Sequence, residues 1–175
     1  YFNRDYEPYA KQRDRSIIQA LSKDIHISHF KDHVIYERHE VLTNGQSYFK
    51  VFTPYYNKWL QTDENLNESL RTFSCDLSKL TKFKIIDMHS KEDIYKLLNF
   101  KQQNEGLYLL PLEDLEKFRL KITHYKENRD FPHQDSTSKI SPHLRFGTIS
   151  IRDAFKLSNE IQNEGSVTWK KELIW

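Results

Sequence analysis

Apolar side chains recur at three- and four-residue steps through residues 112–129, directly after Pro111. This spacing places them on one face of an α-helix, and proline is favoured in the first turn because its missing N–H would have no helical partner. The pattern therefore predicts one continuous helix that Pro111 opens. Its expected buried positions are Leu112, Leu115, Phe118, Ile122 and Tyr125.

Three shorter helices are predicted after this one. The first begins at Pro142 and ends before Gly147, because glycine readily takes the left-handed conformation that closes a helix. The second follows Ser150, with Asp153 completing a capping box. The third begins near residues 166–168.

The first sixty residues carry both a helical and a strand pattern. Residues 1–24 should contain a helix whose apolar positions include Ile17, Ile18 and Leu21. Residues 33–42 form a short β-branched run, which predicts a strand. A helix followed by a strand is typical of the end of an α/β layer.

Turn and proline signals divide the chain that follows. An Asn-Gly pair at residues 44–45 predicts a turn, and Thr53 and Pro54 predict the N-cap and the first residue of another helix. Residues 61–106 are polar and only patchily periodic. They are expected to connect two domains, with one or two short helices such as residues 90–100.

Composition indicates a folded chain without a membrane-spanning segment. Aromatic residues make up 14% of the sequence beside 30% charged residues, whereas disordered segments are poor in aromatic residues. No apolar run approaches the roughly 20 residues that a bilayer-spanning helix needs. The single cysteine, Cys75, excludes an internal disulfide and suits a reducing cytoplasm.

Charge and histidine spacing narrow the possible ligands. The net charge is only +2, but basic residues outnumber acidic ones over residues 121–156. That excess fits either a phosphate-facing surface or an ordinary solvated one. His26, His29 and His33 lack the cysteines or paired carboxylates that would complete a metal site, so none is expected.

A hydroxyl-rich stretch lies directly before Pro142. The free N–H groups at a helix start, next to short hydroxyl side chains, form a corner that can bind phosphate. Plain N-capping by serine or threonine is the alternative interpretation. The polar members of the stretch are Ser136, Thr137, Ser138, Lys139 and Ser141.

Three segments carry motifs that occur together in a known family. RDFPHQDSTSKISPHLRFGTIS, residues 129–150, matches an Arg-Asp-x-Pro run followed by Thr-Ser-(Arg/Lys)-(Leu/Ile)-Ser-Pro-x-Leu-x-Phe-Gly. KVFTPYYNKW, residues 50–59, matches an upstream Val-Phe-Thr-Pro-(Phe/Tyr) motif, and WKKELIW, residues 169–175, matches the start of a Trp-x-x-Glu-Leu-x-Trp helix. In content and order they resemble the DNA photolyase/cryptochrome family.

That resemblance implies an α/β part followed by a mainly α part. Residues 1–60 would form the end of a Rossmann-like antenna domain, residues 61–108 a long interdomain linker, and residues 109–175 the first helices of a helical FAD-binding domain. The chain opens on Tyr1 and stops at Trp175 within an apolar helical pattern. It is therefore interpreted as an internal fragment, expected to be inactive and free of flavin by itself.

The resemblance implies FAD contacts for the hydroxyl-rich stretch and for two aromatic residues. Lys139 stands where many members have arginine, so it keeps the charge but loses the bidentate fork. The antenna pigment stays open, because residues 8–11 differ from the folate-binding members. Tyr125 ends an apolar stripe, which also suits a core position. The implied flavin-binding residues are Tyr125, Thr137, Ser138, Lys139, Ile140, Ser141 and Trp169.

The resemblance also implies contacts with UV-damaged DNA. Arg129 would bind the duplex backbone, and a structural ion pair with Asp130 or Asp135 is the alternative. Glu172 would hydrogen-bond a flipped-out pyrimidine pair and Trp175 would stack on it, since a lesion cannot reach a buried cofactor from within the duplex. Tryptophan at helical spacing is otherwise usually a core residue.

The implied activity is that of a light-driven deoxyribodipyrimidine photo-lyase, a carbon–carbon lyase. Reduced FAD would donate an electron to the pyrimidine dimer and thereby split it. Two alternatives stay open: a cryptochrome-type blue-light photoreceptor with the same fold, and a flavin-free relative that binds nucleic acid. No protein partner is evident in the sequence.

Overall fold

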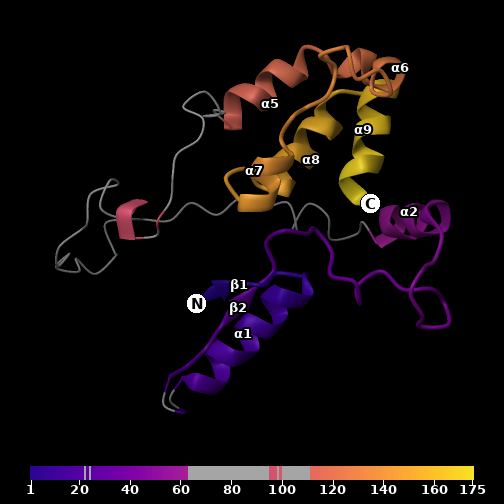
Figure 1. Cartoon of the computed structure of the whole chain (residues 1–175). Coiled ribbons are helices and arrows are strands. Elements are labelled where there is room, and N and C mark those ends of the chain that lie inside the picture. Colours follow the sequence, from indigo (N-terminus) through magenta and orange to yellow (C-terminus); the bar gives the residue numbers. More distant parts are fainter. Residues whose placement is uncertain (22, 24, 63–94, 98, 100–110) are drawn as a thin grey trace, which may run out of the picture. The chain divides into compact units, whose positions relative to one another are not determined.

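Figure 1 shows the computed structural model of the chain, which describes residues 1–21, 23, 25–62, 95–97, 99 and 111–175. The chain divides into two compact units, one formed by residues 1–71 and 110–175 and the other by residues 72–109. The elements named below all belong to the first unit. The connection predicted over residues 61–106 lies almost wholly outside the described residues, although residues 95–97 are helical.

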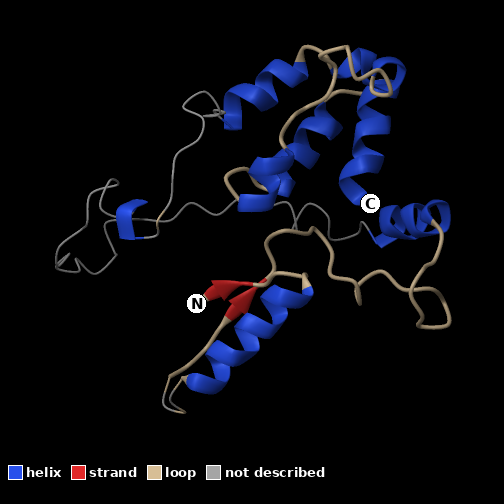
Figure 2. Cartoon of the chain, viewed as in Figure 1, coloured by secondary structure: helices blue, strands red, loops and turns tan. Residues whose placement is uncertain are grey.

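The N-terminal elements are two short strands and the helix between them. Strand β1 (Phe2–Asn3) pairs in parallel with β2 (His29–Phe30), and α1 (Pro8–Ala20) connects them (Figure 2). Parallel strands need a crossover connection, which is usually a helix. Pro8 is the first residue of α1, where its fixed φ suits the helix. The helix predicted within residues 1–24 is confirmed.

The strand predicted for residues 33–42 is wrong. That segment runs through bends and turns, and strand pairing occurs instead at β2, just before it. The side chains of Ile35, Tyr36 and Val41 are nonetheless buried, in a cluster that includes Trp59. The β-branched run marks burial rather than strand pairing, because an irregular segment needs the same apolar side chains when it is covered.

Helix α2 (Phe52–Gln61) begins earlier than the sequence predicts. Its N-cap is Val51, two residues before the expected Thr53, and no side chain caps it. Pro54 therefore lies third in the helix, where it is tolerated because N–H groups of the first turn have no helical acceptor. The turn predicted at residues 44–45 is confirmed.

Three elements replace the single long helix that the apolar stripe predicts. They are α5 (Pro111–Arg119), the 3-10 turn η3 (Ile122–His124) and α6 (Tyr125–Asn128). At the break, the N–H of Lys121 donates to the carbonyl of Phe118 at 2.8 Å. This three-residue hydrogen bond tightens the chain and ends α5.

The predicted buried face is confirmed from Leu115 onward. Leu112 is the exception, since 68% of its surface is exposed. A 3-10 turn has 3.0 residues per turn instead of 3.6, so it rotates the following side chains relative to a continuous helix. After this change, Ile122 and Tyr125 still lie in the same cluster as Phe118.

Helix α8 (Ile151–Glu160) starts where it is predicted to start, with Ser150 as its N-cap. The Ser150 hydroxyl accepts a hydrogen bond from the N–H of Arg152 at 3.2 Å. The prediction that Asp153 completes a capping box with Ser150 is wrong. The Asp153 carboxylate instead lies 3.9 Å from Nζ of Lys156, its neighbour along the helix face.

Helices α7 (Ser141–Phe146) and α9 (Glu164–Ile174) lie on either side of α8 in the chain. Gly147 ends α7 with a φ of 66°, the left-handed closure predicted for it. Helix α9 begins two residues before its predicted start. A capping box begins α9: the side chain of Asn163 accepts from the N–H of Ser166, whose hydroxyl accepts from the N–H of Asn163.

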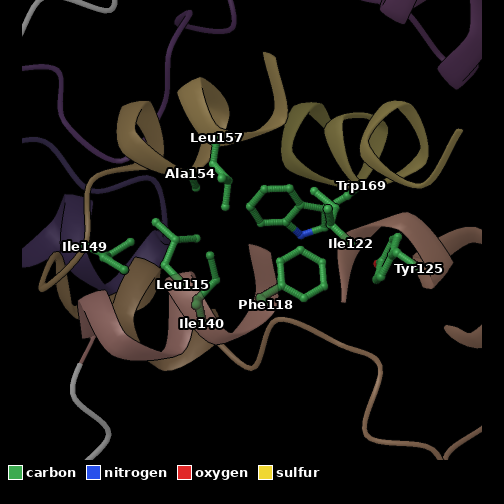
Figure 3. Packing of buried hydrophobic residues seen from close by; sticks show 9 residues of the cluster. All are labelled: Leu115, Phe118, Ile122, Tyr125, Ile140, Ile149, Ala154, Leu157 and Trp169. Atoms are coloured by element: carbon green, nitrogen blue, oxygen red, sulfur yellow. The ribbon is translucent and has the colours of Figure 1, made fainter. Parts of the chain in front are cut away.

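One hydrophobic cluster joins α5, η3, α6, α8 and α9 (Figure 3). At its centre the rings of Phe118 and Trp169 pack at a tilt of 57°, with centroids 4.8 Å apart. Burying two such rings removes a large apolar area from water, which is the main favourable contribution to folding. The buried members are Leu115, Phe118, Ile122, Tyr125, Ile140, Ile149, Ala154, Leu157 and Trp169.

A second cluster packs α2 against α8 and the end of α9. The rings of Trp59 and Phe155 lie 5.1 Å apart, and Ile174 completes the contact. The guanidinium of Arg152 donates to the carbonyl of Asp32 at 3.0 Å beside it. The described residues thus form a small parallel β-α-β start followed by packed helices, which agrees with the predicted α/β-then-α order.

Gly165 allows α9 to lie directly against η3. A Cβ atom built at this position would lie 1.8 Å from the carbonyl oxygen of Ile122 and 2.7 Å from that of Thr123. Both distances are far inside van der Waals contact, and the obstructing atoms are backbone. Any side chain at this position would therefore push α9 away from the cluster.

We predict that Gly165→Ala lowers the free energy of unfolding by about 3 kcal/mol, since overpacking a core typically costs about 1–3 kcal/mol and here the obstruction is backbone. Urea denaturation followed by circular dichroism measures the change. Gly45→Ala is the matched control, because its nearest atom would lie 3.9 Å away in an exposed turn. Equal stability of the two variants would contradict the close-approach interpretation.

Candidate functional site

Helix α9 carries three of the residues that the sequence assigns to a site, and each has a different neighbour. Trp169 is 3% exposed and packs on Phe118 of α5. Glu172 pairs with Arg129, which follows α6. Trp175 lies at the end of the helix and contacts α2. The helix therefore positions these side chains toward three separate elements.

Arg129 forms the central ion pair of this region. Its Nη1 donates to Oε1 of Glu172, and its Nε lies 3.6 Å from Oδ1 of Asp130. The pair with Asp130 was one of the two structural alternatives expected for Arg129. The alternative ion pair of Arg129 with Asp135 is wrong, because Asp135 is paired with Lys121 and Lys139 instead.

Tyr125 lies beneath this ion pair with its ring in the core. Its ring meets that of Phe118 edge-on at 5.6 Å, and the Arg129 guanidinium lies 6.0 Å from its centroid. Burial, followed by the nearby Glu172 carboxylate, raises the pKa of the Tyr125 hydroxyl above its usual value. The phenol thus stays protonated and can donate a hydrogen bond. The core packing is confirmed, and a ligand contact of the hydroxyl stays a prediction.

The hydroxyl-rich stretch does not cap α7 as the simplest interpretation supposes. The N-cap of α7 is Ile140, and no side chain hydrogen-bonds to the helix start. The Ser136 hydroxyl is buried and donates to the carbonyl of Asn128 at 3.0 Å. Thr137 is exposed. Among the described residues, no hydrogen bond engages the hydroxyls of Thr137, Ser138 and Ser141.

The backbone of this stretch is held in an uncommon conformation next to the core. Lys139 has a φ of 55°, a left-handed value that costs a residue with a side chain roughly 1–2 kcal/mol. Ile140 follows it, is fully buried, and belongs to the same cluster as Trp169. The Lys139 ammonium lies 2.6 Å from Oδ1 of Asp135. The stretch is therefore tied to the core on one side and to an ion pair on the other.

Trp175 is largely exposed, at 72%. Its ring meets those of Phe52 and Tyr55 on α2 edge-on, with centroids 5.1 and 6.1 Å away. A cavity of about 330 Å³ lies beside it, lined also by residues of the 33–38 segment. The motif at residues 50–59 contains Phe52 and Tyr55, but no local pattern in the sequence indicates that they meet Trp175.

Neither a metal-ligand cluster nor a membrane-spanning helix occurs among the described residues. No cluster of three or more histidine, cysteine, aspartate or glutamate side chains there has the arrangement of a metal site. None of the described helices has the length and apolar composition that crossing a membrane requires.

Comparisons with family models, curated proteins and solved structures all find photolyases. The family model described as DNA photolyase matches residues 1–74. Curated relatives align over the whole chain: a deoxyribodipyrimidine photo-lyase of Salmonella typhimurium is 31% identical, and one of Synechococcus sp. is 28% identical, each covering 100% of this chain. The chain is thus similar to DNA photolyases over its whole length.

The chain spans less than two fifths of those relatives, 38% and 39% of their lengths. A solved structure of a bacterial class III photolyase from Agrobacterium tumefaciens matches this chain with a TM-score of 0.72. The match covers 99% of this chain and 38% of that protein, at 22% identity. At that identity it supports the fold alone.

We predict that the two tryptophans of α9 differ sharply in their effect on stability. Trp169→Ala should lower the free energy of unfolding by about 3–5 kcal/mol, as expected when a buried aromatic side chain is removed. Trp175→Ala, at the exposed end of the same helix, should cost about 1 kcal/mol or less. Thermal unfolding measures both. Similar losses would contradict the assignment of Trp169 to the core and Trp175 to the surface.

Asp135 should make stability depend on acid pH. Hydrogen bonds from Lys121 and then Lys139 lower the pKa of its carboxyl from 3.8 to about 2. A carboxyl with a lowered folded-state pKa stabilises fully above its unfolded value and loses this contribution as the pH falls. The stability difference between wild type and Asp135→Asn should therefore be constant above pH 5 and shrink between pH 4 and 2. A pH-independent difference in urea denaturation would refute this.

Proposed function

We propose that the chain is part of a light-driven, FAD-dependent deoxyribodipyrimidine photo-lyase that repairs UV-induced pyrimidine dimers in DNA. The observation that carries the proposal is that curated proteins of this name align with the entire chain, including the segment with Arg129, Glu172 and Trp175. The single cysteine supports a cytoplasmic location.

We further propose the domain division that the sequence suggests. Residues 1–60 would close a Rossmann-like antenna domain, residues 61–108 would link it onward, and residues 109–175 would begin the FAD-binding domain. The β-α-β start and the family match over residues 1–74 support the first part. The helical cluster from Pro111 onward supports the last.

The hydroxyl-rich stretch fits a flavin diphosphate in its chemistry. A positive φ at Lys139 followed by φ −85° and ψ 2° at Ile140 is a succession in which neighbouring N–H groups can converge on an anion. The hydroxyls nearby are not used as helix caps. When bound, reduced FAD would supply the electron for repair. The residues proposed to hold it are Tyr125, Thr137, Ser138, Lys139, Ile140, Ser141 and Trp169.

Two side chains at the end of α9 suit recognition of a flipped-out lesion. Trp175 presents an exposed ring, and stacking of a base on such a ring contributes about 1–3 kcal/mol. Glu172, three residues earlier and half exposed, can accept hydrogen bonds from the pyrimidine edges. Arg129 would bind a phosphate of the duplex and so position it without reading sequence.

Light-dependent repair of an oligonucleotide that contains one cyclobutane dimer tests the proposal in the complete protein. We expect flavin absorption in the purified protein and repair only under near-UV or blue light. Glu172→Gln should slow repair about tenfold, the effect of weakening one charge-assisted hydrogen bond.

Glu116→Gln, which neutralises an exposed glutamate on α5, is the control and should repair normally. A protein that binds flavin and repairs nothing would instead indicate a photoreceptor. A protein without flavin would indicate a nucleic-acid-binding relative.

A further inference from the structure

Arg129 has two negative partners if the proposed function holds. The proposal assigns it to a phosphate of the duplex, yet its guanidinium already pairs with Glu172. Glu172 is in turn the carboxylate proposed to accept hydrogen bonds from the lesion. A carboxylate that is held by Arg129 is not free to receive those hydrogen bonds.

The geometry shows that this pair is accessible from solvent. Arg129 Nη1 donates to Glu172 Oε1, and 32% of the Arg129 side chain and 48% of the Glu172 side chain are exposed. Asp130 lies 3.6 Å from Nε of the same guanidinium. The Tyr125 ring closes the inner side at 6.0 Å. A ligand can therefore approach Arg129 only from the outer side, where the carboxylates lie.

We propose that a DNA phosphate displaces Glu172 from Arg129 and that this exchange releases the carboxylate for the flipped pyrimidine pair. Half-exposed ion pairs are weak in water, so breaking one is not prohibitive. A backbone phosphate carries one negative charge, as the carboxylate does, and its two free oxygens match the guanidinium fork. The neighbouring phosphates of the duplex add to the attraction. The exchange rests on the proposed function, because it requires that DNA binds at this face.

The exchange makes Arg129 a specificity-determining residue although it contacts no base. On undamaged DNA, Glu172 loses its arginine partner and gains none, which weakens binding. On damaged DNA, the flipped pyrimidines offer new donors to the released carboxylate. The ratio of the two affinities therefore rises because the pair exists in the free protein.

A double-mutant cycle on DNA binding tests the exchange in the complete protein. Dissociation constants for one duplex, with and without a pyrimidine dimer, are measured in the dark by fluorescence anisotropy. Glu172→Gln should bind undamaged duplex about 2- to 5-fold more tightly, since no ion pair has to break. It should bind damaged duplex with less preference than the wild type.

Arg129→Gln should weaken binding to both duplexes and reduce the salt dependence by about one phosphate contact. In the Arg129→Gln background, Glu172→Gln should no longer tighten binding to undamaged duplex. Glu116→Gln controls for loss of a carboxylate elsewhere on the surface and should change neither affinity.

Three results would contradict these expectations, and they can be told apart. If Glu172→Gln still tightens binding to undamaged duplex in the Arg129→Gln background, the effect is simple removal of a charge, and the exchange is overturned. If Glu172→Gln binds undamaged duplex no more tightly than the wild type does, the exchange is overturned as well. Wild-type protein that shows no preference for damaged duplex would instead refute the proposed function.

Discussion

The contact of helix α9 with the turn η3 is the constraint on which the candidate site depends. Gly165 permits that contact, because its missing side chain leaves room for the carbonyls of η3. Residues four and seven positions later lie on the same helix face. With the separation set at Gly165, Trp169 reaches Phe118 in the core and Glu172 reaches Arg129 near the surface.

Local signals in the sequence predicted the helices better than the strands or the breaks. Proline placed the starts of α5 and α7 to within a residue, and glycine placed the end of α7, because these residues restrict the backbone directly. The β-branched run at residues 33–42 led to a wrong prediction of a strand, because its side chains are buried without strand pairing. The 3-10 turn after Phe118 has no local signal in the sequence, and its carbonyls are the atoms that Gly165 of α9 approaches.

The candidate site could be predicted only as a set of residues, through the family motifs. Those motifs named Arg129, Glu172 and Trp175, but not the ion pair between the first two. A pair separated by 43 positions depends on how two helices meet, and no periodicity describes that. The same limit applies to Phe52 and Tyr55 beside Trp175.

Native-state amide hydrogen exchange tests most directly whether α9 organises this region as one cooperative unit. We expect the amides of α9 and of the segment from Phe118 to Tyr125 to open together, with the same free energy and the same denaturant dependence. Exchange of the α9 amides through a separate, lower-energy opening, while α5 and α6 stay protected, would contradict it.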